Sequence, residues 1–251
     1  MILDQRRREI LNLIESAGFV SLHELAERAG VSESTVRRDL EHLEGIGQIR
    51  RTRGGAAYIG ESLTTLDERS VQALPQKQAV GRVAASLVHS GEAILLDGGT
   101  TTLEVARNLS GKSLQVVTNS VPVVNLLAIQ PNIELVVVGG YVYPKTGVAL
   151  GPLATAALAQ IHVRRLFMSV GGITEKGLYN SNSLLAETER AMLSAAEEVI
   201  VVTDSSKFGH SALAHLAPLE RVHRVVADSG ISDEWKQSLT SAGIALTIAE
   251  V

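Results

Sequence analysis

Seven aliphatic runs in the second part of the chain constrain its fold more than any other feature. They are Ala93–Asp97, Leu114–Thr118, Ile133–Gly139, Leu166–Val170, Val199–Asp204, Val222–Asp228 and Ile244–Ile248. Runs of this kind are typical of parallel strands that are buried on both faces. Stretches with helical character alternate with them, and this alternation indicates right-handed βαβ units. The sequence therefore predicts an α/β fold built on an open, mostly parallel sheet.

The composition narrows the compartment and the chemistry. Hydrophobic residues make up 45% of the 251 residues and charged residues 20%, so the chain can bury a core. It contains no cysteine, which excludes disulfides and thiolate metal sites and fits a reducing compartment. No run approaches the ~20 apolar residues of a membrane span, and the first residues lack the apolar stretch of a signal peptide. We expect a soluble, cytoplasmic protein without a membrane partner.

The first sixty residues have a different pattern, in which apolar residues follow the helical period. We expect a first helix over residues 3–16. Ser21 and Glu24 form a capping box that opens a second helix. Ser32 caps a third helix, and the stretch 48–59 is typical of a short hairpin. The predicted domains are a winged helix-turn-helix over residues 1–59, a linker over 60–74 and an α/β domain over 75–251.

The third predicted helix has the side chains expected of a helix that reads DNA. Its apolar face, Val36, Leu40 and Leu43, must pack inward, which leaves polar and basic side chains outside. Arginine can donate two hydrogen bonds to guanine in the major groove, and serine and threonine hydroxyls suit phosphates or base edges. Residues 1–60 contain nine arginines and no lysine, most of them in three clusters. The predicted contacts with double-stranded DNA are Arg6, Ser32, Ser34, Thr35, Arg37, Arg38, Arg51 and Arg53.

The first of these clusters, Arg6, Arg7 and Arg8, lies at the start of the first predicted helix. Cations at this end oppose the helix dipole, so another group must offset their cost, and a DNA phosphate is one candidate. Two alternatives remain for the arginines: ordinary solvated side chains, or a winged helix that binds protein. Three clusters on one small domain argue against the first alternative, and the richness in arginine argues against the second.

A second set of polar and glycine residues lies at the ends of the predicted strands. Asp97-Gly98-Gly99-Thr100-Thr101-Thr102 follows the first strand and precedes a helix. Glycine lets the backbone approach a ligand and a helix N-terminus favours an anion, so this loop predicts a phosphate site. Ligands of open α/β sheets bind beyond the carboxyl ends of the strands. The other such strand ends are Thr118-Asn119-Ser120, Gly139-Gly140, Gly171-Gly172 and Asp204-Ser205-Ser206-Lys207. The alternative is that these turns only connect a strand to a helix.

These motifs resemble the DeoR family of bacterial regulators of sugar metabolism. In the first domain the resemblance rests on Arg6, on Ser32–Leu40 and on Arg53-Gly54-Gly55-Ala56. In the second it rests on Asp97-Gly98-Gly99-Thr100-Thr101, Thr118-Asn119, Gly139-Gly140, Gly177-Leu178, Glu187 with Arg190-Ala191-Met192, and Asp204–Phe208. It implies a C-terminal domain related to the ribose-5-phosphate isomerase and CoA-transferase folds. It also implies a repressor that a phosphorylated sugar or sugar alcohol releases from its operator.

The strand ends and the resemblance together give an expected effector site. Its residues are Asp97, Gly98, Gly99, Thr100, Thr101, Asn119, Ser120, Gly139, Gly140, Gly171, Glu187 and Lys207. We expect Lys207 to supply the positive charge that a phosphate needs. The regulator could also act as an activator, because the sign of regulation is not written in the chain. Helix-turn-helix proteins usually bind as dimers on half-sites about 34–36 Å apart, so we expect a homodimer or a homotetramer.

A rival hypothesis is that the second domain catalyses sugar-phosphate isomerisation or acyl transfer. Isomerisation needs a base at carbon, usually a carboxylate with a supporting acid. The isomerases carry clustered acids at the corresponding strand end, whereas this chain has Val170–Thr174 there. Glu187 remains as a lone base, and the histidines have no metal-ligand spacing. We therefore expect no enzyme activity, no cofactor and no metal site.

Overall fold

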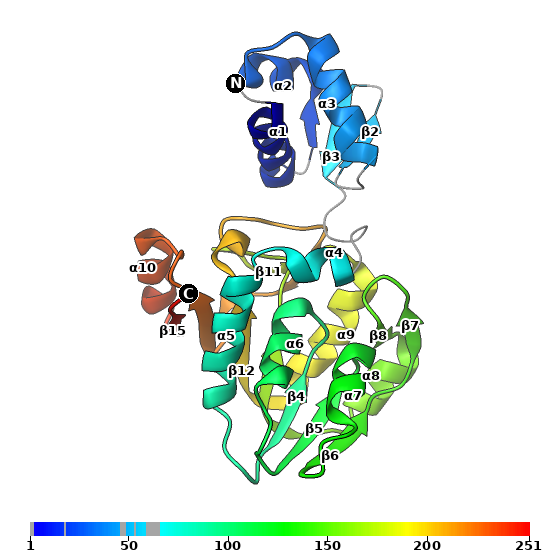
Figure 1. Ribbon diagram of the computed structural model, residues 1–251, viewed down its shortest axis with the longest axis vertical. Coiled ribbons are helices and arrows are strands. Elements are labelled where there is room, and N and C mark those ends of the chain that lie inside the picture. Colours follow the sequence, from blue (N-terminus) through cyan, green and yellow to red (C-terminus); the bar gives the residue numbers. More distant parts are fainter. Residues whose placement is uncertain (1–2, 18, 46–48, 53, 59–65) are drawn as a thin grey trace.

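The computed structural model describes residues 3–17, 19–45, 49–52, 54–58 and 66–251. Figure 1 shows two units along the chain, a small N-terminal one and a larger C-terminal one. The elements of the first unit run from Leu3 to Tyr58, and those of the second begin at Leu66.

The N-terminal unit combines three helices with a small antiparallel sheet. Its elements are α1 (Leu3–Ala17), β1 (Phe19–Ser21), α2 (Leu22–Ala29), α3 (Glu33–Gly45), β2 (Ile49–Thr52) and β3 (Gly55–Tyr58). The Ser21 side chain caps α2 by accepting a hydrogen bond from the backbone N–H of Glu24. Gly30 ends α2 in the left-handed conformation, with φ of 62°. The three predicted helices and the predicted hairpin of β2 and β3 are confirmed.

The strand β1 was not predicted, and it ties the hairpin to the helices. It pairs with β3, which gives the sheet order β1-β3-β2. The approach requires glycine at position 55, because a Cβ there would lie 2.2 Å from the carbonyl oxygen of Val20. Ile10 and Ile14 of α1 share one core with Val36 of α3 and Ile49 of β2. The helices and the wing therefore pack as one body.

The C-terminal unit is built on a seven-stranded parallel sheet, as the sequence predicts. Its strands are β4 (Ala93–Leu96), β5 (Leu114–Thr118), β6 (Ile133–Val137), β9 (Val163–Met168), β12 (Ala196–Thr203), β14 (Arg224–Asp228) and β15 (Ala245–Ala249). The order is β15-β14-β12-β9-β4-β5-β6, and every neighbouring pair is parallel. The chain first builds outward from β4 to β6 and then returns to the other side of β4 with β9. The topological switch point thus lies between β4 and β9, where ligands of open sheets bind.

Helices cover both faces of this sheet (Figure 1). They are α4 (Leu66–Val71), α5 (Leu74–Ser86), α6 (Thr100–Arg107), α7 (Val121–Leu127), α8 (Pro152–Leu158), α9 (Ser183–Ser194) and α10 (Asp233–Ser241). Buried side chains of α5, α6 and α7 form the core on one face. Those of α8, α9 and α10 form the core on the other face. The helix α4 lies within the predicted linker 60–74 and has no buried residue.

Two smaller sheets extend the carboxyl end of the main sheet, and neither was predicted. One pairs β7 (Tyr141–Tyr143) with β8 (Val148–Leu150). The other has the order β10-β11-β13 and consists of β10 (Gly172–Thr174), β11 (Gly177–Asn180) and β13 (Ala214–Ala217). Two 3₁₀ helices, η2 (Ser205–Lys207) and η3 (Leu219–Arg221), complete the unit. These additions turn the strand ends into a covered site.

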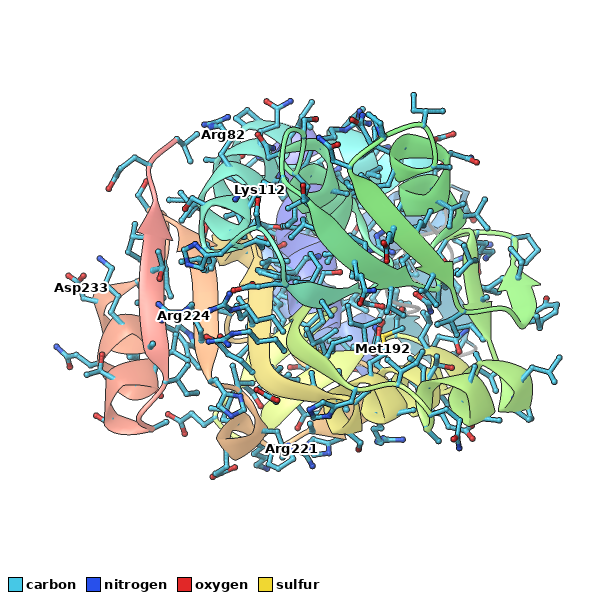
Figure 2. All side chains as sticks on the ribbon, turned by 90° about the horizontal axis from the view of Figure 1, so that it is seen from below. Arg82, Lys112, Met192, Arg221, Arg224 and Asp233 are labelled. Carbon is cyan, nitrogen blue, oxygen red and sulfur yellow. The ribbon has the colours of Figure 1, made fainter. Side chains whose placement is uncertain are left out.

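Ion pairs join the opposite, amino end of the sheet. The guanidinium of Arg165 on β9 pairs with Glu92, just before β4, and with Glu198 of β12. Arg224 of β14 lies 3.8 Å from Glu198. Figure 2, which views the molecule from below, labels Arg224 at this end together with Lys112, whose ammonium donates to the carbonyl groups of Ala85 and Val88. Charged side chains at the amino end therefore link neighbouring strands and loops.

Candidate functional site

The N-terminus of α3 presents a group of hydroxyls. Ser32 caps the helix, and its Oγ lies 3.3 Å from the backbone nitrogen of Thr35. The same Oγ is 2.9 Å from the hydroxyl of Ser34 and 3.0 Å from that of Thr35. Ser32 and Ser34 are exposed and Thr35 is half-buried. The first turn of α3 thus offers hydroxyl donors and acceptors to a partner.

The predicted exposed face of α3 is confirmed. Arg37 and Arg38 are both exposed, whereas Val36 and Leu40 are buried in the core. The Arg37 guanidinium lies 3.9 Å from the carboxylate of Glu33, one turn earlier on the same exposed surface. An exposed ion pair of this kind contributes little to stability, so the guanidinium can exchange Glu33 for another partner.

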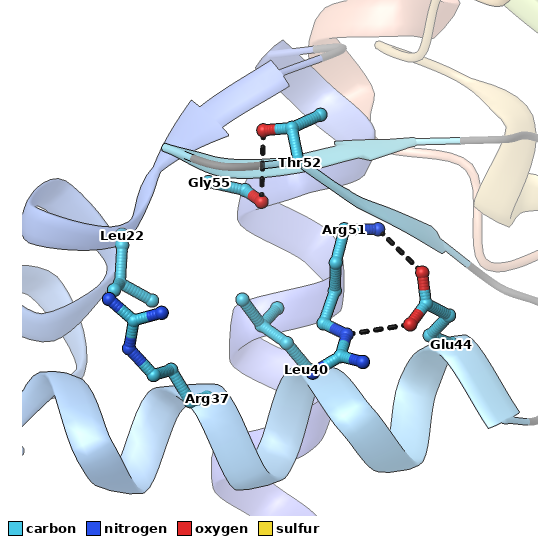
Figure 3. Close-up of a pocket in the computed structure, with 7 residues that line it drawn as sticks. All are labelled: Leu22, Arg37, Leu40, Glu44, Arg51, Thr52 and Gly55. Carbon is cyan, nitrogen blue, oxygen red and sulfur yellow. Dashed lines mark hydrogen bonds and ion pairs between the residues drawn. The ribbon is translucent and has the colours of Figure 1, made fainter.

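The wing arginine Arg51 is held against α3. Its Nε lies 2.6 Å from the carboxylate of Glu44, and its Nη1 lies 2.9 Å from that of Glu41. These hydrogen bonds raise the pKa of Arg51 above its ordinary value. A hollow of about 390 Å³ lies between α3 and the hairpin. Figure 3 shows Arg37 and Arg51 on its two sides. The predicted contact Arg53 lies outside the described residues.

The predicted DNA contact Arg6 has a partner inside the module. Its Nε lies 2.6 Å from Oδ2 of Asp39, and Nε of Arg7 lies 3.1 Å from Oδ1 of the same residue. Asp39 is buried in α3. The hydrogen bond from Arg6 to Asp39 raises the pKa of Arg6. Asp39 is therefore the anion that offsets the unfavourable interaction of Arg6 and Arg7 with the helix dipole, a role for which the sequence suggested a DNA phosphate. Arg8 is exposed.

In the C-terminal unit, the loop after β4 lies at the topological switch point between β4 and β9. The Asp97 side chain is buried and accepts hydrogen bonds from the backbone of Gly98 and Ser169, which link the ends of β4 and β9. A Cβ at Gly98 would lie 1.9 Å from Cγ1 of Val148, and one at Gly99 would lie 2.1 Å from Oγ of Ser169. Gly99 caps α6, whose first residues Thr100 and Thr101 are buried. Neighbouring chain segments thus pack directly on these glycines.

A small pocket lies beside this loop. It is lined by Arg69, Gly98, Thr146, Ser169, Val170, Gly171, Asn180, Leu185 and Glu189, and its volume is about 10 Å³. Four buried polar atoms of the described residues have no hydrogen-bond partner: Asp97 Oδ2, Asn119 Oδ1, Thr146 Oγ1 and Glu189 Oε2. Such atoms are rare in folded proteins and call for an explanation, of which an absent ligand or water is one. Two of the four belong to pocket-lining residues.

Two buried carboxyl groups give the site its electrostatic character. Burial raises the pKa of Asp97 to about 7, against the lowering effect of the backbone hydrogen bonds and of the charge on Arg69. Burial also raises the pKa of Glu189 well above its ordinary value, and the nearby Asp97 charge raises it further. Asn180 Nδ2 donates a hydrogen bond to Glu189 Oε1 over 2.6 Å, and this bond lowers the pKa of Glu189. Paired acids with raised pKa values are typical of functional sites.

Two residues of the expected effector site do not line this pocket. Glu187 is exposed on α9, and Glu189, two residues further along the helix, lies in the pocket. Lys207 lies in η2 and does not line the pocket, whose wall contains Arg69. Periodicity alone could have favoured position 189, because Leu185, Ala186 and Met192 mark the buried face of α9. No sequence signal connects Arg69 to the strand ends.

The strand ends beyond β4 and β9 have structural roles of their own. Asn119 Nδ2 donates to the carbonyl oxygen of Ala149 in β8, which covers this end of β5. The Ser120 side chain caps α7. Gly139 is exposed, and Gly140 leads into β7 with φ of 155°. Of the predicted effector residues, only Gly98 and Gly171 line the pocket directly, and Asp97 and Asn119 contribute orphaned atoms to its surroundings.

Two other features concern the described part of the chain, namely metal ligands and membrane-spanning helices. No group of three or more His, Cys, Asp or Glu side chains there is placed to hold a metal ion. No helix there is long and apolar enough to cross a bilayer.

Comparison with known proteins assigns both units. A family model of the DeoR-like helix-turn-helix domain matches residues 6–62. A model of the DeoR C-terminal sensor domain matches residues 72–229. A ribose 5-phosphate isomerase A from Methanocaldococcus jannaschii matches 55% of each chain at 21% identity, with a TM-score of 0.41.

Curated relatives match nearly the whole chain. The HTH-type transcriptional regulator YulB of Bacillus subtilis is 32% identical over 98% of this chain and 97% of the relative. A candidate aga operon transcriptional repressor of Escherichia coli O157:H7 is 34% identical over 96% of this chain and 91% of the relative. The HTH-type transcriptional regulator UlaR of Escherichia coli is 28% identical over 96% of this chain and 97% of the relative. With an exposed arginine-bearing helix in one unit and a sensor-type sheet in the other, the chain belongs to the DeoR family of helix-turn-helix transcriptional regulators.

Proposed function

We propose that this regulator represses a carbohydrate-catabolism operon, and that a phosphorylated sugar or sugar alcohol releases it from its operator. The chain is a DNA-binding regulator and not an enzyme, since the family models and the relatives describe regulators. The repressor sign is supported by the name of the Escherichia coli O157:H7 relative. One observation carries the proposal: a small pocket beside buried carboxyl groups at the sheet switch point, in the same chain as an exposed arginine-bearing α3. We also propose a cytoplasmic location, because the operator DNA that it would bind lies there.

For DNA, we propose that α3 enters the major groove with its N-terminal turn first. The exposed arginines would read bases, and the hydroxyls of the first turn would bind phosphates or base edges. The proposed contacts are Ser32, Ser34, Thr35, Arg37, Arg38, Arg51 and Arg53. Arg51 would exchange or share its carboxylate partners on α3 when it meets a phosphate. Arg6 would act by holding Asp39, and through it the position of α3.

For the effector, we propose binding between the loop after β4 and the residues after β9. A sugar carries hydroxyls that donate hydrogen bonds, and the orphaned oxygens of Asp97 and Glu189 are acceptors without donors. The proposed site comprises Asp97, Gly98, Gly99, Thr100, Thr101, Asn119, Gly171, Asn180 and Glu189. The first turn of α6, at the switch point, would favour the phosphate. The proposed domains are 1–59 for DNA and 75–251 for the effector, with α4 between them.

We also propose that the regulator is a homodimer or a homotetramer, because two half-sites on DNA need two reading heads. The edge strand β6 supports a contact between copies of this chain. Val136 and Val137 of β6 are exposed, as are Tyr141 and Val142 of the adjoining β7. Exposed apolar groups on an unpaired strand edge favour association. Sedimentation of the wild type and of Val136→Lys tests this: a variant that sediments like the wild type excludes this edge.

The function is tested with the full chain and duplex DNA from upstream of its own gene. We expect binding that weakens steeply as salt rises, because phosphate contacts release counterions. One member of a panel of sugar phosphates should release the DNA. At ~100 times its dissociation constant, it should stabilise the protein by about 2.7 kcal/mol.

Three outcomes would contradict the proposal. If binding to duplex DNA is absent or insensitive to salt, the proposed operator binding is wrong. If no phosphorylated sugar or sugar alcohol of the panel changes DNA binding, the proposed effector class is wrong. A compound of the panel that strengthens DNA binding, together with loss of transcription when the gene is deleted, identifies an activator.

A further inference from the structure

The helix α4 is attached to the sensor unit by polar contacts. It spans Leu66–Val71 and has no buried residue. The backbone N–H of Leu66 donates to the carbonyl oxygen of Lys145 over 2.9 Å. The ammonium of the buried Lys77 on α5 donates to the carbonyl oxygen of Arg69 over 2.7 Å. A helix that buries no side chain in the core belongs to the less stable part of a fold, so α4 can move without disrupting the core.

The Arg69 side chain forms part of the pocket wall. It lines the pocket together with Thr146, which follows the Lys145 that holds the start of α4. Its charge acts on both buried carboxyl groups, lowering the pKa values of Asp97 and Glu189 against the effect of burial. Arg69 therefore brings a positive charge from α4 to the wall of the pocket.

The volume of the pocket shows that a wall must move before a sugar phosphate can bind. About 10 Å³ corresponds to about one water-sized probe, whereas small-molecule sites usually enclose ~300–1,000 Å³. Val170, which follows β9, and the buried face of α9 belong to the main core, where close packing opposes movement. The wall that lacks buried side chains is α4. Figure 1 shows α4 above α6.

We propose that Arg69 binds the phosphate of the effector and that α4 moves with it, so that the segment next to the DNA-binding domain is itself part of the effector site. This inference rests on the proposed sugar-phosphate function and adds the phosphate ligand and the transmitting element. Residues 59–65 alone separate Tyr58 of the DNA-binding domain from Leu66 of α4 in the chain. A shift of α4 therefore displaces the point from which the DNA-binding domain is tethered. The effector then binds the state with α4 displaced, and DNA binds the other state.

The test compares Arg69→Gln, Arg69→Lys and Lys207→Gln, with Arg164→Gln as control. Arg164 is an exposed arginine at the amino end of the sheet, far from the pocket along β9. The probes are inorganic phosphate, ribose 5-phosphate and glucose 6-phosphate, and the readouts are thermal stabilisation and release of operator DNA. We expect Arg69→Gln to need at least tenfold more of each probe and to bind DNA normally without it. Arg69→Lys should recover part of the response, and Arg164→Gln should behave as the wild type.

The outcomes separate this inference from the proposed function. If the wild type responds and Arg69→Gln responds at the same probe concentration, Arg69 is not the phosphate ligand; a loss in Lys207→Gln alone would assign that role to Lys207. If Arg69→Gln loses DNA binding or thermal stability without any probe, Arg69 is structural. If the wild type responds to none of the probes, the inference fails at its foundation, while DNA binding by the same sample still tests the regulator.

Hydrogen exchange tests the movement of α4 separately. The backbone N–H of Leu66 is protected by its bond to Lys145. We expect saturating probe to speed exchange in the peptide 66–71 several-fold, while exchange in the core strand β9 does not rise. Unchanged exchange in 66–71 would show that the pocket opens elsewhere and would overturn the role of α4.

Discussion

The Arg6 guanidinium of α1 forms a salt bridge with the buried carboxylate of Asp39 in α3, with 2.6 Å between Nε and Oδ2. Arg7 donates to the other oxygen of the same carboxylate over 3.1 Å. A buried carboxylate is costly unless it is paired and hydrogen-bonded, and here two guanidinium groups supply both conditions. The pair also fixes α3 against α1, so the helix that we propose to read DNA is positioned from inside the domain.

We therefore expect Arg6→Ala to weaken DNA binding through lost stability of the N-terminal domain. The variant leaves Asp39 buried with only Arg7 beside it, and the domain should melt at a lower temperature. Circular dichroism melting and protease sensitivity of residues 3–58 measure this. Arg8→Ala is the matched control, because Arg8 is an exposed neighbour on the same helix. If Arg6→Ala keeps the wild-type melting temperature but reduces the salt dependence of DNA binding, Arg6 is a phosphate contact.

Arg37→Ala and Arg38→Ala should each weaken operator binding by about 1–3 kcal/mol if the side chain reads a base. Neither residue is part of the core, so the melting temperature should stay near that of the wild type. Fluorescence anisotropy with operator and scrambled DNA separates the two kinds of contact. A base contact loses discrimination between these DNAs, whereas a phosphate contact weakens binding to both equally. Full operator affinity in the double variant would exclude α3 as the reading helix.

The architecture followed from the sequence because its causes are local. All seven strands of the main sheet begin and end within a few residues of the aliphatic runs, because parallel strands that are buried on both faces consist almost entirely of apolar residues. Ser21 and Glu24 marked the start of α2 for the same reason: the cap bond joins residues three apart.

The site itself depended on long-range packing, and there the sequence was less informative. Glu187 and Glu189 differ by two positions on α9, and only the docking of that helix decides which one faces the pocket. Arg69 comes from a polar segment predicted as a linker, and it lines the same pocket as Gly98 through tertiary packing that no local pattern encodes. The hairpin of β7 and β8 is short, and its pairing covers Asn119 from a distance in sequence.

Substitution of the first loop glycine should disable the sensor. In Gly98→Ala the new Cβ would overlap Cγ1 of Val148, which is fully buried in β8, so the hairpin must shift. Overpacking of this kind costs about 1–3 kcal/mol. We expect lower stability in denaturant, followed by the fluorescence of Trp235, the single tryptophan of the chain, and a weakened effector response. Gly139→Ala is the control, because a Cβ there meets open space; equal effects of the two substitutions would contradict this account.

The buried acids should make the sensor less stable as the pH rises through 7. Burial raises the pKa of Asp97 to about 7 and that of Glu189 well above its ordinary value. Between its ordinary pKa of about 4 and its folded pKa, each group holds a proton in the folded state that it has lost in the unfolded state. The unfolded state thus binds fewer protons, and this contribution to stability is fully present below pH 4 and is lost as the pH passes the folded pKa. Wild-type protein, melted in the absence of effector and followed by Trp235 fluorescence, should therefore lose stability from pH 6 to pH 8.

Neutral variants isolate this effect from every other titrating group. Asp97→Asn and Glu189→Gln cannot ionise, so the decline in melting temperature between pH 6 and pH 8 should become shallower in both. Glu187→Gln provides the matched control: the same substitution two residues earlier on α9, at an exposed position, should leave the decline unchanged. A decline that persists in Asp97→Asn and Glu189→Gln would mean that these carboxyl groups are already ionised at pH 6. The orphaned oxygens would then carry negative charge, which would favour a cationic group of the effector at that position over a hydroxyl.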